Sequence, residues 1–364
     1  MEKVNNTIVK IRYPSLNGLR AISIFFVIFS HLSIQHKIFS ELFKYKLLQP
    51  IINIIRDGNL GVNVFFVISG FLITTLLSEE YRKKQTISLR NFYIRRTLRI
   101  FPAYYFYLFV LFILQINNLV SVGGSSSWLS AITYTKYFNW KLDWVTAHAW
   151  SLSIEEHFYL FWPLLFLLGD KIRKNAAMVL VLLVPVIKLC LYFHPITWMN
   201  ELTIFKRIDS IAIGCLTALY KDELLTVLKP YFKASFYLSV LGIYFLIYLP
   251  TISSKLNVNL DFVIMLFGST YGTLANVLIG IILLYSVFGH QGLWFRLLNS
   301  KILNYIGLLS YSIYLWQQLY ISGYKYWITS FPQNVFFVFV TAIFSYHCIE
   351  QPFLRLKEKF QKRS

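Results

Sequence analysis

Charged residues are scarce in this sequence. Only 14% of its 364 residues are Asp, Glu, Lys or Arg, whereas 57% are hydrophobic and 18% are aromatic. Because a soluble globular domain carries about 25% charged residues, the composition excludes an ordinary water-soluble protein. It is typical of a chain that crosses a membrane several times.

Several chemical signatures are also missing. The three cysteines, Cys190, Cys215 and Cys348, lie in apolar stretches without the spacing of a metal site. We interpret them as packed small residues and expect no metal. The sequence contains no glycine-rich phosphate loop and no nucleophile elbow. No polar stretch is long enough to fold separately, so we expect one transmembrane domain over residues 1–364, with a basic cytoplasmic tail from about residue 350.

The sequence does contain about ten apolar segments, each near the roughly 20 residues that cross a bilayer core. The fold class that we predict is therefore an all-α polytopic integral membrane protein with about ten transmembrane helices. The segments lie near residues 19–36, 60–78, 100–119, 149–169, 176–194, 208–220, 235–250, 272–289, 304–322 and 332–349.

Basic residues greatly outnumber acidic ones, with 35 Lys and Arg against 16 Asp and Glu and a net charge of +19. They gather between the second and third apolar segments and in the C-terminal tail. By the positive-inside rule, both termini are expected in the cytoplasm. Attraction to anionic lipid accounts for such a basic surface, so we expect membrane lipid, and no nucleic acid, as a partner.

Two ionisable residues share one face of the first apolar segment. Arg20 and His31 are eleven positions apart, which places them within about 20° of one helix face and roughly 16 Å apart along the axis. Charge within a bilayer is costly and usually functional. The pair therefore predicts a polar path from the cytoplasmic rim into the membrane.

Glu155 and Glu156 reach a similar depth from the opposite side. Both carboxylates are expected about 10–12 Å below the outer edge of the bilayer core, and His31 roughly 12 Å below it. A carboxylate beside an imidazole fixes its tautomer and strengthens it as a base. We predict a catalytic site of His31, Glu155 and Glu156. The alternative is a structural pair that holds helices together.

Arg96 and Arg99 lie at the start of the third apolar segment and project from one side of a helix. Guanidinium groups bind phosphate through paired hydrogen bonds, and a helix N-terminus favours an anion. Together with Arg20, the two residues predict a clamp for a polyphosphate ligand on the cytoplasmic side. The alternative is that these arginines anchor the helix at lipid headgroups.

Other residues in the spans are candidates for a substrate cavity. Ser69 lies among small residues that suit close helix packing, and Asp209 lies just inside a span, where it needs a partner. Tyr311 and Tyr314 can line a cavity or donate interhelical hydrogen bonds. Trp150 can belong to an interfacial aromatic belt or to a glycan platform. The full candidate set is Ser69, Trp150, Ser153, Arg207, Asp209, Tyr311 and Tyr314.

These residues fall in strings that together resemble the membrane acyltransferase 3 family, bacterial O-acyltransferases of surface glycans, over nearly the whole chain. Arg20 and His31 match the family's basic residue, ten-residue spacer and histidine. Arg96 and Arg99 match its arginine pair. The other matching strings are residues 65–71, 150–159, 207–210, 310–316 and 350–353.

The resemblance implies transfer of an acyl group, most often acetyl, from a cytoplasmic acyl-CoA such as acetyl-CoA to a hydroxyl of a surface or lipid-linked glycan. In such an enzyme the three arginines would hold the CoA phosphates. His31 would act as general base, oriented by one of the two glutamates. The resemblance also implies a multi-pass protein of the bacterial inner membrane, working beside glycan-assembly machinery.

The sequence departs from the family pattern at two positions. His157 stands where many members have glutamine, and Gln317 stands where many have histidine, so no second catalytic histidine is expected at position 317. We expect the stand-alone form of the family, without an extracytoplasmic hydrolase-like domain. The rival function is a transporter or flippase of a glycan or glycolipid, because polar residues at mid-depth also mark transport paths. A non-catalytic membrane subunit of a glycan-assembly complex is a third possibility.

Overall fold

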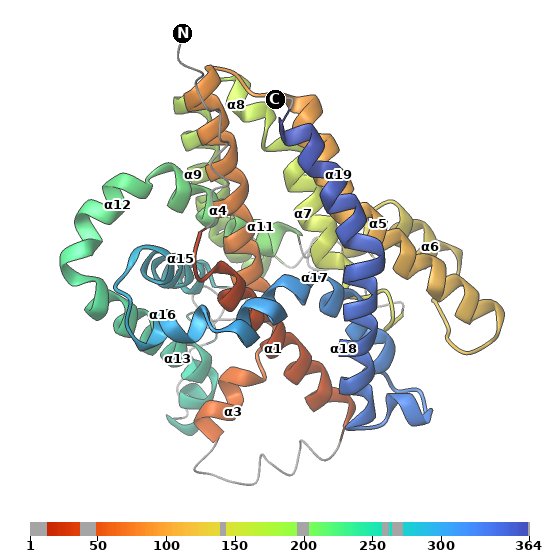
Figure 1. Ribbon diagram of the computed structural model, residues 1–364. Helices are drawn as coiled ribbons and strands as arrows, with labels where there is room; N and C mark the ends of the chain where they lie inside the picture. Colours follow the sequence, from red (N-terminus) through yellow and green to blue (C-terminus); the bar gives the residue numbers. More distant parts are fainter. Residues whose placement is uncertain are drawn as a thin grey trace.

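Every regular element that the structure describes is a helix (Figure 1). The computed structural model describes residues 13–36, 49–138, 143–194, 204–256, 261, 263 and 272–362. The α-helices are α1 (Leu16–Gln35), α3 (Gln49–Ile55), α4 (Gly58–Lys84), α5 (Leu89–Ile116), α6 (Ser125–Ile132), α7 (Ala149–Phe161), α8 (Leu164–Leu167), α9 (Asp170–Phe193), α11 (Ile204–Leu219), α12 (Lys221–Leu228), α13 (Phe232–Leu256), α15 (Thr273–Phe288), α16 (Leu293–Leu298), α17 (Lys301–Tyr320), α18 (Gln333–Ser345) and α19 (Gln351–Lys362).

The described helices confirm an all-α protein of the multi-pass membrane class. The predicted apolar segments fall on α-helices, but the segment 149–169 is divided between α7 and α8. Helices α7, α11, α15 and α17 are shorter or less apolar than a full span. The crossing of the membrane by ten helices and the cytoplasmic location of both termini stay predictions. Six described segments are long and apolar enough to cross a membrane, namely Leu16–Gln35, Gly58–Lys84, Leu89–Ile116, Asp170–Phe193, Lys221–Leu256 and Gln333–Leu356.

Helix α4 packs against α1 and, along much of its length, against α11, while α17 packs on α1. Glycine permits the close α4–α11 contact. A Cβ added at Gly70 would lie 2.0 Å from the carbonyl oxygen of Ile211, and one added at Gly214 would lie 2.2 Å from that of Val67. Small residues at these positions let two backbones approach closely, as the packing interpretation of this part of α4 predicts.

The two ends of the bundle differ in chemistry, and we name them by it. The turn between α4 and α5 and the last turns of α19 lie together at the top of Figure 1. The first turns of α5 carry Arg96 and Arg99, so we call this the arginine end. Helix α18 begins toward the bottom of the picture, at what we call the far end, and continues through a π-helical turn (Tyr346–Glu350) into α19.

Candidate active site

Three arginines come together from the early turns of α1 and α5. Arg20 of α1 interacts electrostatically with both Arg96 and Arg99 of α5, and the two α5 side chains also interact with each other. The predicted cluster of guanidinium groups is therefore present. Carboxylates interact with the same arginines, Glu155 with Arg20 and Arg99 and Glu350 with Arg99. That the three guanidinium groups hold a phosphate stays a prediction.

Arg96 is held by an aromatic ring and two carboxylates of α7. Its guanidinium carbon lies 3.5 Å from the centre of the Tyr159 ring. Its Nη2 is 3.7 Å from Oε2 of Glu155, and its Nε is 3.6 Å from Oε1 of Glu156. These separations exceed ordinary hydrogen-bond lengths. The carboxylates thus balance the charge of Arg96 without saturating its donors.

Tyr159 links this ion cluster to α4. Its hydroxyl lies 2.5 Å from Oγ of Ser69 and 3.1 Å from Oε2 of Glu155, and its side chain is buried. Ser69 is therefore part of the cluster, as a neighbour of Tyr159. Sequence reasoning missed Tyr159, although its place four residues after Glu155 puts both on one helix face.

Arg99 faces a third acidic residue, at the π-helical turn. Glu350 interacts electrostatically with Arg99 and accepts a hydrogen bond from the hydroxyl of Ser312. π-Helical turns are rare and often occur at functional sites. Glu350 belongs to the string 350–353 that matches the family, but no role was predicted for it from the sequence.

His31 lies farther along α1 and is held by α17. Its Nδ1 is 2.6 Å from Oε1 of Gln317, and its ring meets that of Trp144 edge-on at 5.3 Å. With Oε1 of Gln317 as the acceptor, the neutral imidazole carries its proton on Nδ1 and keeps its lone pair on Nε2. His31 is thereby prepared to accept a proton at Nε2.

The structure corrects the expected partner of His31. Among the described residues, no hydrogen bond or ion pair joins His31 to Glu155 or Glu156; both carboxylates pair with Arg96. Helical rise predicts the depth of a side chain but not its lateral neighbours, and a desolvated carboxylate pairs with the nearest cation. The catalytic roles of His31, Glu155 and Glu156 stay predictions.

A second imidazole lies close to the first and was missed by sequence reasoning. His148, just before α7, is buried, and Oε1 of Gln318 lies 2.5 Å from its Nδ1 and 2.9 Å from its backbone nitrogen. Gln317 and Gln318 are adjacent on α17, and the two histidines that they hold interact electrostatically. No local sequence pattern pairs a loop histidine with a glutamine 170 residues away.

Arg207 and Asp209 hold helices together in a separate polar group. Nη1 of Arg207 donates to Oδ1 of Asn63 at 2.9 Å, and its guanidinium lies 5.2 Å from the centre of the Trp150 ring. Oδ2 of Asp209 accepts from Thr273 at 2.7 Å. Polar side chains of α4, α11 and α15 therefore bind one another, as interhelical contacts in membranes do.

The remaining cavity candidates also bond within the protein. The hydroxyl of Tyr311 donates to the carbonyl oxygen of Ile100 at 2.9 Å. That of Tyr314 lies 2.6 Å from Oγ of Ser151. Oγ of Ser153 donates to the carbonyl oxygen of Ala149 at 2.8 Å. For the two tyrosines, interhelical hydrogen bonding accounts for the hydroxyl groups.

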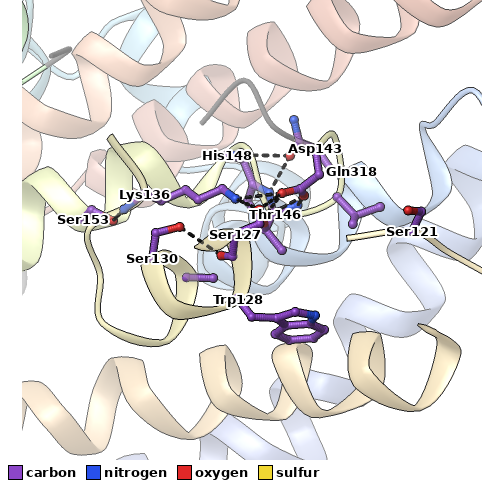
Figure 2. Close-up of polar contacts among 12 residues, drawn as sticks. Ser121, Ser127, Trp128, Ser130, Lys136, Asp143, Thr146, His148, Ser153 and Gln318 are labelled. Atoms are coloured by element: carbon purple, nitrogen blue, oxygen red, sulfur yellow. Dashed lines mark hydrogen bonds and ion pairs between the residues drawn. The ribbon is translucent and has the colours of Figure 1, made fainter. Parts of the chain in front are cut away.

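A buried ion pair fixes the loop that leads to His148 (Figure 2). Nζ of Lys136 lies 2.7 Å from Oδ2 of Asp143, and the two side chains are 0% and 4% exposed. The Ser127 hydroxyl bonds to both. Oδ1 of Asp143 accepts from the backbone nitrogen and the hydroxyl of Thr146, both at 2.7 Å. Asp143 thus ties the ion pair to the turn that precedes His148.

The pKa of Asp143 reflects these contacts. Burial alone raises the pKa of the carboxyl, but hydrogen bonds from Lys136, Ser127 and Thr146 outweigh it and hold the pKa below its usual range. A group whose pKa is lower in the folded state stabilises that state above its unfolded pKa. The contribution of Asp143 to the stability of the fold is therefore complete above about pH 4 and is lost as the pH falls further.

Replacing Asp143 by asparagine is expected to destabilise the fold by about 3–5 kcal/mol, because the Lys136 ammonium stays buried without a countercharge. The measurement is thermal unfolding of the detergent-solubilised protein at neutral pH. Asp170→Asn is the control, since Asp170 pairs with Arg173 at 2.7 Å but is 54% exposed and should cost less than about 1 kcal/mol. Equal losses in the two variants would contradict a structural role for the buried pair.

Comparison with known proteins relates this chain to transferases. A family model described as an acyltransferase domain matches residues 13–348. A Staphylococcus aureus strain COL protein, named provisionally as an O-acetyltransferase, is 29% identical over 381 aligned positions, covering 94% of this chain and 58% of its own. The O-acetyltransferase OatA of Staphylococcus aureus strain NCTC 8325 is 32% identical over 223 positions, which cover 56% of this chain and 34% of OatA. The chain spans less than two thirds of these relatives, and no solved structure matches it.

Proposed function

The chain belongs to the acyltransferase domain family, and we propose that it is a membrane O-acyltransferase. Its donor is a cytoplasmic acyl-CoA, with acetyl as the acyl group, and its acceptor is a hydroxyl of a surface or lipid-linked glycan. The names of the relatives, both O-acetyltransferases, favour acetyl. The protein then acts in a bacterial cytoplasmic membrane.

One observation carries the proposal. The cluster of Arg20, Arg96 and Arg99 lies at one end of α1, and His31, with a free lone pair on Nε2, lies eleven residues along the same helix. That separation is roughly 16 Å. A donor with phosphates at one end and a reactive thioester at the end of a long arm fits this arrangement. The cationic cluster binds the phosphates, and the thioester reaches the imidazole.

His31 acts as general base in the transfer. The acceptor hydroxyl gives its proton to Nε2 as its oxygen attacks the thioester carbonyl carbon. The carbon–sulfur bond then breaks, and the departing CoA thiolate takes the proton from the imidazolium. The products are a glycan ester and free CoA, and His31 returns to its starting tautomer because Gln317 holds Nδ1–H throughout.

The two glutamates beside the arginine cluster set how tightly CoA is held. Glu155 and Glu156 balance the charge of Arg96 in the free protein. When phosphate binds, Arg96 exchanges one anion for another, so the carboxylates keep the site from retaining the product CoA too tightly. In this proposal the glutamates tune donor binding and His31 alone handles the proton.

Mass spectrometry of surface and lipid-linked glycans tests the proposal in cells that make the protein. Wild-type cells should carry an acyl ester on a glycan that cells without the gene lack, while the glycan backbone is the same in both. Identical acyl content in the two strains would contradict the proposal. A transporter predicts a different result, loss of the whole glycan from the surface.

A further inference from the structure

An apolar cavity of about 520 Å³ lies between α5, α17 and α18, on the side of α17 away from α1. This volume is within the range of small-ligand sites. It is lined by Phe106, Val110 and Leu114 of α5, by Trp316, Leu319 and Tyr320 of α17, and by residues of the following loop and of α18.

The lining suits hydrocarbon and no charged group. Every residue that lines the cavity is aliphatic or aromatic except two threonines. The hydroxyl of Thr341 already bonds to that of Tyr320 at 2.8 Å, and that of Thr329 bonds to backbone oxygens of the loop. The threonine hydroxyls on the walls are thus engaged, whereas Nε1 of Trp316 is buried without a hydrogen-bond partner among the described residues. The cavity offers its ligand chiefly carbon.

The shape of the cavity follows the helices. Its α5 wall runs from Phe106 to Leu114, eight residues or about 12 Å along the axis, so its long direction is that of a lipid chain in a bilayer. Tyr326 and Trp327, which are 41% and 67% exposed, stand at the far end. Tyrosine and tryptophan collect at the boundary between lipid and water, which marks this end as the mouth.

The mouth lies beside the approach to His31. Trp144, whose ring touches His31 at 5.3 Å, donates through its indole nitrogen to the carbonyl oxygen of Ile321 at 2.7 Å. Tyr324, three residues after Ile321 in the sequence, is part of the cavity wall. Trp144 therefore connects His31 to the loop that continues into the cavity wall.

From this geometry we infer that the cavity binds the hydrocarbon chain of a lipid-anchored glycan acceptor and so presents the glycan to His31. The inference rests on the proposed function and gives it a substrate class, a glycan still attached to a membrane lipid. The donor enters from the arginine end and the acceptor lipid from the far end, so the two substrates do not compete for space.

The experiment compares two acceptors that differ only in the chain. One is the deacylated surface oligosaccharide, free in solution, and the other is a long-chain alkyl glycoside of the same oligosaccharide. Wild-type protein should use the alkyl glycoside with a kcat/KM roughly tenfold higher or more, since burial of two methylene groups is enough for that factor. Equal values for the two acceptors would overturn the inference and leave the proposed function standing. Loss of transfer to both would count against the proposed function.

Two substitutions fill the cavity, and a neighbour supplies the control. Val110→Trp and Leu114→Trp should each remove the preference for the alkyl glycoside while transfer to the free oligosaccharide is unchanged. Phe109→Trp alters the adjacent residue, which is 58% exposed and outside the cavity lining, and should keep the preference. If both filled variants retain the full preference, the chain binds elsewhere and the inference is wrong.

Discussion

Replacing His31 by alanine lowers kcat by about 10²–10⁴, the usual contribution of a general base. In the proposed transfer Nε2 of His31 accepts the proton, while Oε1 of Gln317, 2.6 Å from Nδ1, holds the ring in place. Alanine leaves no group to take the proton. The measurement is release of free CoA from acetyl-CoA by purified protein in the presence of acceptor glycan, with folding checked by unfolding temperature.

His36 provides the matched control on the same helix segment. Its Nε2 lies 2.8 Å from Nδ2 of Asn334, so it has a structural partner and lies five residues beyond the proposed base. His36→Ala should keep most of the activity. An active His31→Ala variant, or equal losses in both variants, would remove His31 from the mechanism.

Loss of a guanidinium from the arginine cluster weakens acetyl-CoA binding about 10- to 100-fold. A hydrogen bond to a charged group contributes about 1.5–3 kcal/mol, and each 1.4 kcal/mol is a factor of ten in Kd. Arg96→Gln and Arg99→Gln each remove one charge from the group that includes Arg20. The measurement is equilibrium binding of acetyl-CoA to the purified protein at fixed ionic strength.

Arg95 is the control for both variants. It precedes Arg96 in sequence, but its Nη2 pairs with Oε2 of Glu80 at 3.1 Å, away from the cluster. Arg95→Gln should bind acetyl-CoA like the wild type. The same affinity in all three variants would show that the cluster does not hold the donor and would favour the lipid-anchoring interpretation of these arginines.

The neutral partner of His31 has a consequence for the reaction. A carboxylate beside the imidazole would stabilise the imidazolium that forms when the proton arrives. Gln317 holds the ring in place without offering a negative charge. The imidazolium therefore has no adjacent countercharge from Gln317, which favours immediate transfer of the proton to the CoA thiolate.

The sequence predicts the chemistry of the arginine end better than that of the histidine site. Arg20, Arg96 and Arg99 could be grouped because each lies at the start of an apolar segment that is predicted to begin on the same side of the membrane. Their charges therefore share a depth and an end of the bundle. In the structure Arg20 interacts electrostatically with Arg96 and Arg99, and their role in binding a donor stays a prediction. The sequence did not predict that Tyr159 stacks on Arg96 or that Glu155 and Glu156 pair with it.

The partner of His31 could not be predicted in the same way. Helical rise places His31, Glu155 and Glu156 at a similar depth, but azimuth and helix order decide which side chains touch. Gln317 stood out only as a departure from the family pattern. The Lys136–Asp143 pair lies in a loop with no periodic signal, and its burial depends on helices that are distant in sequence.

The most direct test of the account uses proteoliposomes in which all protein molecules have the same orientation in the membrane. The central claim is that the donor binds at the arginine end and the acceptor is acylated from the far end. The acceptor probe is the deacylated surface oligosaccharide, placed on the far side. Acyl transfer should occur when acetyl-CoA is supplied on the side of Arg96 and Arg99, and should stop when it is supplied only on the opposite side. Equal transfer from either side would contradict the claim.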